Sequence, residues 1–300
     1  METPRGPVWI GRGITAVLVG LGIAGLVFVL SKATAEPPPA LTVPSISLEK
    51  KDFDYEPLRR VHEEFVEEGG LVDYAGLKED PTDLDAFLAE VKRVSPHTNL
   101  ATFPSRNEAL AYWINAYNAW MLKAVIEAYP IDSVQDISED PGVFDAKGRV
   151  CGGEDLTLNE IEHQIIRVDF LEPRAHFAVN CASMGCPWLP QQPFLPEGLD
   201  GQLDHETRRF FGAPSHLVID HGGSTVRLSP IMKWYEEDYL IWLEEERGLQ
   251  DPSVLDYVKL YIPEGKASTI SDEFEIRWLE YDWALTDANA EWGERPVTLD

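Results

Sequence analysis

The chain has 300 residues, and its 52 aspartates and glutamates against 25 lysines and arginines give a net charge of −27. With 44% hydrophobic residues and nine tryptophans, the composition is typical of a globular protein, and the length suits one large domain or two small ones. A negative field of this size repels phosphate backbones and excludes nucleic acid as a partner.

The first element in the chain is an uncharged apolar run, GITAVLVGLGIAGLVFVL, at residues 13–30. A helix of this length spans about 27 Å, close to the thickness of a membrane core, which predicts an uncleaved signal-anchor within residues 1–35. The alternative is a signal peptide cleaved near Ala33 and Ala35, whose apolar region is usually shorter, about 7–15 residues. Arg12 keeps the N-terminus inside in both cases. We therefore expect a single-pass protein of the cell membrane with an extracytoplasmic domain, or a secreted or periplasmic protein if the signal is cleaved.

The proline-rich residues 36–51 predict a stiff linker. No second linker and no internal repeat follows, so the simplest organisation is one globular domain at residues 52–285 with an acidic tail at residues 286–300. The expected fold class is α+β, a helix-rich single domain whose small sheet is formed mainly by the C-terminal half.

Apolar residues at helical spacing predict a series of helices in this domain. The strongest is residues 106–128, because Ser105 and Glu108 can form a capping box at its start and Pro130 follows its end. It is apolar on nearly all sides, so we expect a central helix with Trp113 buried. Further helices are predicted at residues 55–68, 81–94, 158–168 and 198–211, from Ser229 and Pro230 onward, and between Asp251 and Pro263.

Strand patterns gather after residue 175. In the first predicted strand, His176 and Asn180 share one face and Cys181 points to the other, which makes Cys181 the poorer partner for His176. The predicted strands are residues 176–179, a hairpin at residues 216–229, and residues 274–283.

Four polar side chains on the predicted helices need partners. Asn115 and Asn118 lie on buried faces, where an unpaired amide costs about 1–3 kcal/mol, so each either fixes a neighbouring loop or lines a site. His163 and Arg167, four residues apart, lie opposite the core stripe of their helix and face either solvent or a cleft.

The segment HFAVNCASMGCP, residues 176–187, holds two of the three cysteines. Four interpretations stay open. An exported chain can form a Cys181–Cys186 disulfide. A zinc site would use His163, His176, Cys181 and Cys186, but their spacing matches no common finger. The cysteines can also be small buried apolar residues. Finally, Cys186 can be a nucleophile with His176 or His163 as its base.

Five blocks of the sequence are similar to the family called domain of unknown function 547. The resemblance covers roughly residues 52–285, and it implies that the polar residues of these blocks occupy motif positions without naming their roles. Met184 and Gly185 stand where family members often have a serine beside the second cysteine. The blocks are LAYWINAYNAWML (110–122), LTLNEIEHQIIR (156–167), EPRAHFAVNCASMGCPWL (172–189), LSPIMKWYEEDY (228–239) and LEYDWAL (279–285).

These observations predict a membrane-tethered extracytoplasmic domain that acts as a cysteine-dependent hydrolase or acyl transferase on a small molecule or peptide. Residues 13–30 would contact the membrane, and neither a cofactor nor a metal is expected. The alternative is a non-catalytic binding or envelope-assembly domain with a structural Cys181–Cys186 disulfide. The predicted catalytic residues are Cys186, His176 and His163, and the predicted binding residues are Asn115, Asn118, Arg167, Arg174, Asn180, Cys181 and Ser183.

Overall fold

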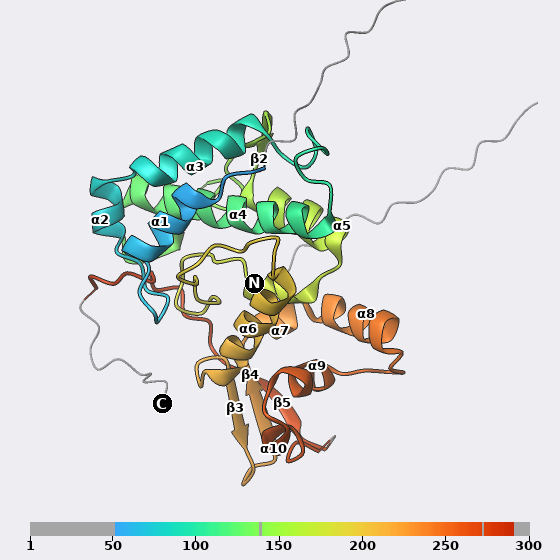
Figure 1. Ribbon diagram of the computed structural model, residues 1–300. Helices are drawn as coiled ribbons and strands as arrows, with labels where there is room; N and C mark the ends of the chain where they lie inside the picture. Colours follow the sequence, from blue (N-terminus) through green and yellow to red (C-terminus); the bar gives the residue numbers. More distant parts are fainter. Residues whose placement is uncertain (1–51, 138–139, 272, 291–300) are drawn as a thin grey trace, which may run out of the picture. The chain divides into compact units, whose positions relative to one another are not determined.

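The computed structural model describes residues 52–137, 140–271 and 273–290 (Figure 1). The apolar run at residues 13–30, the proline-rich linker and residues 291–300 of the acidic tail lie outside the described residues. Of the helices in the described part of the chain, none is both long enough and apolar enough to cross a membrane.

The N-terminal half is a helical layer built around one long helix. In Figure 1 the first and third helices run beside the fourth, and all of these helices contribute buried apolar residues to one core. The helices are α1 (Glu56–Phe65), α2 (Tyr74–Glu79), α3 (Thr82–Arg93) and α4 (Arg106–Ala128).

Helix α4 is the centre of this core. Ser105 and Glu108 form the predicted capping box, with the Glu108 N–H donating to Ser105 Oγ at 3.2 Å and the Ser105 N–H donating to Glu108 Oε2 at 2.7 Å. Trp113 and Ile114 are 1% and 0% exposed, which confirms the predicted burial. Since the helix is apolar on nearly every side, neighbours can cover it all round, and this makes it a rigid support for the segments that follow.

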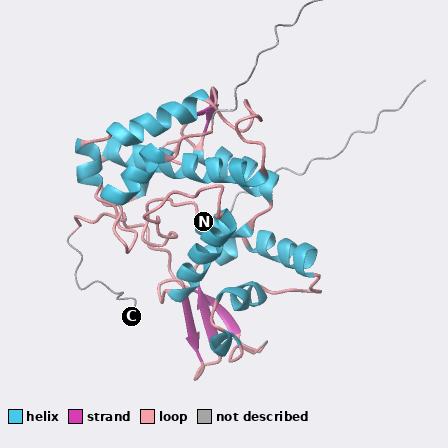
Figure 2. Cartoon of the chain, viewed as in Figure 1, coloured by secondary structure: helices cyan, strands magenta, loops and turns pink. Residues whose placement is uncertain are grey.

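Short elements connect α4 to the second half, and much of this region is loop (Figure 2). A two-stranded antiparallel hairpin, which the sequence did not suggest, packs against α3. The elements are η1 (Val134–Asp136), β1 (Arg149–Cys151), β2 (Glu154–Leu156), η2 (Glu160–Ile166), α5 (Arg167–Phe170), η3 (Pro173–Phe177) and α6 (Leu199–Gly212).

The C-terminal half holds a three-stranded sheet and a second apolar core. The predicted hairpin is present as an antiparallel pair, and the last strand adds to it in parallel, in the order β3-β4-β5. This confirms an α+β fold with its larger sheet in the C-terminal half. The elements are β3 (Leu217–Asp220), β4 (Thr225–Leu228), α7 (Ile231–Trp234), α8 (Glu236–Arg247), α9 (Val254–Tyr261), α10 (Glu264–Ala267) and β5 (Glu275–Trp278).

The strand predicted at residues 176–179 is wrong, because the chain forms the 3₁₀ helix η3 there. Pro173 sits at its first turn with a fixed φ, and the Glu172 side chain caps it by accepting the N–H of Arg174 at 3.3 Å. The alternation of faces therefore does not apply. It had separated His176 from Cys181, but both side chains line one cavity.

After β5 the chain returns to the helical layer. Asp287 pairs with Val72 as an isolated bridge, and the N–H of Ala288 donates to the Val72 carbonyl at 2.9 Å. Thr286 and Asp287 are both buried. The packed structure thus continues past residue 285 to the end of the described residues at Ala290.

Candidate functional site

A cavity of about 300 Å³ lies where the helical layer, the 177–187 loop and the C-terminal segments meet. Cys181 and Cys186 line it, and so do His163 and His176. Its lining comprises Tyr117, Phe144, Asn159, Glu162, His163, His176, Val179, Cys181, Cys186, Pro187, Ile231, Trp234, Tyr235, Tyr281 and Trp283.

One wall of the cavity is a π-helix. The sequence predicts an α-helix over residues 158–168, and the expected capping pair is present, with the Glu160 N–H donating to Thr157 Oγ1 at 2.9 Å. The following turns widen into the π form of η2. Both Glu162 and His163 line the cavity from this segment. Such π segments are frequent at functional sites. Val168, the last residue of the predicted helix and one that an α-helix would turn toward the core, is 62% exposed.

His176 is held by an acidic partner from α8. Its Nε2 lies 2.7 Å from Asp238 Oδ2, and Arg167 donates to both oxygens of the same carboxylate at 2.7 and 2.8 Å. Burial by itself would raise the pKa of Asp238, but the hydrogen bonds from Arg167 and His176 outweigh it and hold the pKa well below its usual range. The carboxylate therefore accepts, Nε2 carries the proton, and Nδ1 is left as the basic nitrogen.

Tyr235 and Glu162 line the part of the cavity next to the His176–Asp238 pair. The His176 ring stacks on Tyr235 with centroids 3.9 Å apart and planes 17° apart, and the Tyr235 hydroxyl donates to Glu162 Oε1. Burial, and next the charge of Glu162, raise the pKa of Tyr235 far above its usual range, so it remains a donor. Arg167 lies over the same ring at 5.1 Å and also donates to His163 Nδ1 at 3.5 Å.

The three cysteines are free thiols, so the structure does not contain the Cys181–Cys186 disulfide of the alternative interpretation. The Cys181 N–H instead donates to Cys186 Sγ at 2.9 Å. Cys186 is 5% exposed, whereas Cys181 is half-buried. Burial, and next the hydrogen bond that it gives to Cys181, raise the pKa of the Cys186 thiol well above its usual range.

The Cys181 sulfur has two hydroxyl neighbours. It lies 3.0 Å from Ser183 Oγ and 3.1 Å from the Tyr281 hydroxyl, and Ser183 donates to Tyr281 at 3.0 Å. Burial by itself would raise the pKa of Cys181, but the hydrogen bonds from Cys186, Ser183 and Tyr281 outweigh it and lower the pKa to about 7. Of the two thiols in the cavity, Cys181 is therefore the one poised to ionise at neutral pH.

The asparagines prove to be clamps on the backbone. Asn118 donates to the Ala178 carbonyl at 2.9 Å and accepts the Asn180 N–H at 2.8 Å, so it fixes the loop before Cys181. Asn115 makes the same pair of bonds with Phe194, at 2.6 and 3.0 Å.

The remaining predicted residues divide between two roles. Asn180 closes the loop itself, accepting the Ala182 N–H at 2.9 Å and donating to the Pro187 carbonyl at 2.7 Å. Arg174 is bound by Glu172 and by Asp200 and Asp204 of α6, and it lines a second cavity of about 480 Å³ on the other side of His176.

Four residues to which the structure gives a role at the site were not identified from the sequence: Glu162, Tyr235 and Tyr281, which line the cavity, and Asp238, which binds His176. All four lie within the sequence blocks that carry the family resemblance, which was the available signal. The long-range contacts that give them their roles, 73 residues apart for Tyr235 and Glu162, leave no local pattern. Within the described residues no group of three His, Cys, Asp or Glu side chains is arranged to hold a metal ion.

Comparison with known proteins gives one match. A family model described as "Protein of unknown function, DUF547" matches residues 101–211, which include α4, η2, η3 and the cysteine loop but not Tyr235, Asp238 or Tyr281. Neither the curated proteins nor the solved structures include a match. The expected resemblance is thus confirmed for the part of the chain from α4 to α6, and over residues 101–211 this chain resembles the DUF547 family.

Proposed function

We propose that the domain is a cysteine-dependent hydrolase or acyl transferase in which Cys181, in place of the expected Cys186, is the nucleophile. One observation carries this proposal: a single cavity is lined by a thiol whose pKa is lowered to about 7 and by a histidine paired with a carboxylate. A nucleophile, a base and a group that orients the base are what cysteine-dependent acyl transfer requires.

The reaction would proceed in two balanced steps. The Cys181 thiolate attacks the acyl carbonyl and forms a thioester, and the leaving group departs with a proton from His176. His176 then takes a proton from water, or from an acceptor alcohol or amine, which attacks the thioester and releases Cys181 as thiolate. The Tyr281 hydroxyl, which accepts from Ser183, stabilises that thiolate, and Asp238 supports the charged imidazole that is present before the first step and again after the second.

An activated ester tests this proposal. With p-nitrophenyl acetate we expect a burst of p-nitrophenol and an acetyl group on Cys181, located by mass spectrometry of peptides. Cys181→Ser should abolish the burst, and His176→Ala should slow the turnover that follows the burst by about 100-fold or more, since His176 is the general base of the second step. Cys151→Ser is the matched control, since Cys151 is buried outside the lining of the cavity and its loss should leave the burst intact. Acetylation of Cys186 with Cys181 unmodified would overturn the assignment.

A non-catalytic binding domain is the second candidate. It is favoured by the absence, within the described residues, of any hydrogen bond between a histidine nitrogen and a cysteine sulfur. Such contacts are often loose before substrate binds, so the geometry is compatible with both candidates. Failure of every activated acyl donor to modify Cys181, despite fast alkylation by iodoacetamide, would favour binding over catalysis.

We also propose that residues 13–30 anchor the protein in a membrane and that the domain lies outside the cytoplasm. The length of the uncharged run and the arginine before it support this location. Mass spectrometry of the native N-terminus distinguishes an anchor from a signal peptide, because a mature chain that begins near Glu36 has lost the run. Residues 52–300 alone should remain in the supernatant when full-length protein sediments with membranes.

A further inference from the structure

We infer that the cavity binds an alkylated ammonium group of the substrate, as in a choline ester. This names the substrate class of the proposed function. It rests on that function only for the acyl-transfer reaction that follows binding. It is drawn from the aromatic side chains and the single carboxylate that line the cavity.

The mouth of the cavity is a continuous aromatic wall. Tyr281 packs between two tryptophans, with its ring centroid 4.8 Å from that of Trp234 and 4.6 Å from that of Trp283. Trp234 is 50% exposed although it is among the largest apolar side chains. An exposed tryptophan at the entrance of a polar cavity offers its ring face to a ligand. Alkylammonium cations are attracted to such faces, most strongly where water is excluded.

The inner part continues the aromatic lining and adds one negative charge. Tyr117, Phe144 and Tyr235 line it with Glu162, whose carboxylate is 7% exposed. After burial, the charge of Glu162 is the next largest cause that raises the pKa of Tyr117 well above its usual range, and the two thiols add to this. Glu162 and the two cysteines therefore lie near the same phenol.

The one side chain of the lining that becomes positive in the proposed mechanism is His176, and its charge is paired with Asp238. No lysine or arginine is among the described residues that line the cavity. Arg167 lies behind the Tyr235 ring, and its charge is paired with Asp238. The net charge of the chain, −27, raises the local concentration of cations further.

A sugar is the other ligand that stacks on aromatic rings, and the cavity suits it less well. A sugar needs many hydrogen-bond partners, but the Asn159 amide is already bound to Asp145 at 2.7 Å and the Glu162 carboxylate already accepts from Tyr235. A trimethylammonium group needs only ring faces and a nearby negative charge.

Calorimetry with two ligands of the same shape tests the inference on the full-length protein. Choline carries the cation, and 3,3-dimethylbutan-1-ol replaces it by a neutral tert-butyl group. We expect choline to bind at least tenfold more tightly. Trp234→Leu and Glu162→Gln should each weaken the binding of choline by roughly five- to tenfold, which is the size expected for one cation–π contact. The affinity for the neutral alcohol should stay nearly unchanged.

The controls separate this inference from the others. Trp242→Leu removes a tryptophan that lines only the second cavity, and it should not affect choline binding. A protein that binds choline but forms no acyl adduct on Cys181 would refute the proposed catalysis and leave this site standing. Equal affinity for choline and the neutral alcohol, or binding of methyl glucoside without binding of choline, would overturn the inference.

Discussion

His176 donates through Nε2 to Oδ2 of Asp238 at 2.7 Å, and 62 residues of chain separate the two. The pair joins the cysteine-containing loop to α8, so the base and the nucleophile come from one segment of the chain and the orienting carboxylate from another. His176 lines both cavities and Asp238 lines the second, so the imidazole lies between the two cavities and its carboxylate partner on the side of the second.

Replacement of the carboxylate tests this pair. Asp238→Asn should slow acylation of Cys181 by about 100-fold or more, because an amide does not support a charged imidazole. It should also lower the free energy of unfolding at pH 7 by about 2 kcal/mol, since Arg167 loses a charged partner. The folded-state pKa of Asp238 is lowered, so this stability is present above its unfolded pKa of about 3.9 and is lost as the pH falls below it.

Denaturant unfolding at pH 7 and pH 3 measures the second effect, and the difference between variant and unmodified protein should shrink at pH 3. Glu237→Gln is the matched control, because Glu237 is the exposed preceding residue of the same helix. A variant that loses stability equally at both pH values would show that the ion pair is not the cause.

The hydroxyl groups around Cys181 predict the pH dependence of its alkylation. In the unmodified protein the iodoacetamide rate should rise with a midpoint near pH 7. Tyr281→Phe removes one hydrogen bond to the thiolate, so the midpoint should move upward by roughly one pH unit, equivalent to about 1.4 kcal/mol. Stopped assays followed by peptide mass spectrometry give the rate for each cysteine separately.

Two control measurements of alkylation test this interpretation. Cys151 should react slowly, because burial raises its pKa to about 12. Tyr129→Phe also removes a hydroxyl hydrogen bond, the partly buried one to Asp287 at 2.8 Å, but neither residue lines the cavity, so the midpoint should stay in place. Faster labelling of Cys186 than of Cys181 would contradict the assignment and restore the expectation from the sequence.

The elements that the sequence predicted well depend on local physics. Helix α4 begins and ends at the expected residues because the Ser105 capping box and Pro130 act within one turn of the helix. The β3–β4 hairpin is formed by short apolar runs on both sides of a glycine pair. Both patterns are local, so each predicts its structure without information about the rest of the chain.

One predicted element was wrong, and the choice between the two cysteines could not be made from the sequence. The segment at 176–179 has too few residues for alternation to be decisive, and Pro173 and the Glu172 cap selected a 3₁₀ helix. The proposal of Cys181 in place of Cys186 as nucleophile depends instead on a contact distant in sequence. Cys181 is distinguished from Cys186 by Tyr281, which lies 100 residues away and becomes a neighbour only in the folded chain.

The two clamping asparagines predict effects of different reach. Asn118→Ala leaves the Ala178 carbonyl and the Asn180 N–H without their partner, so the free energy of unfolding should fall by about 2–4 kcal/mol. The loop that carries Cys181 is then loosened, and its alkylation midpoint should shift as well. Asn115→Ala should cost a similar free energy without that shift, because its partner is Phe194. Equal effects of both variants on Cys181 would refute the local role of Asn118.

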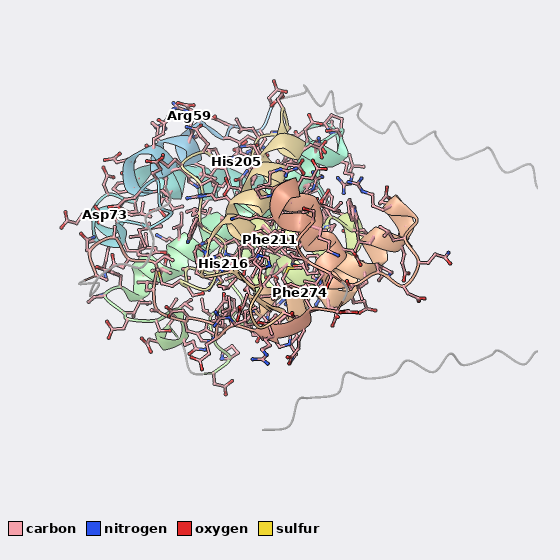
Figure 3. The ribbon with its side chains drawn as sticks, turned by 90° about the horizontal axis from the view of Figure 1, so that it is seen from below. Arg59, Asp73, His205, Phe211, His216 and Phe274 are labelled. Carbon is pink, nitrogen blue, oxygen red and sulfur yellow. The ribbon has the colours of Figure 1, made fainter. Side chains whose placement is uncertain are left out.

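A buried histidine should make the domain sensitive to acid. His216 is 1% exposed, its ring stacks on Phe210 with centroids 3.9 Å apart, and among the described residues neither ring nitrogen has a hydrogen-bond partner. Burial lowers its pKa to about 3. Figure 3 labels it together with His205, which lies on α6.

Because the folded-state pKa of His216 lies below its unfolded value of about 6.5, the unfolded chain takes up the proton first as the pH falls. The unfolding free energy should therefore drop by about 2 kcal/mol per such histidine between pH 6.5 and pH 5.

His216→Phe keeps a flat ring against Phe210 and should remove this contribution. The unfolding free energy of the variant minus that of the unmodified protein should therefore be about 2 kcal/mol larger at pH 5 than at pH 7. His62, whose pKa burial lowers to about 4, should retain its own share of the acid sensitivity. His205→Phe changes an exposed ring and should show no such pH-dependent gain. Parallel stability curves for His216→Phe and the unmodified protein across this range would show that His216 does not titrate as its burial requires.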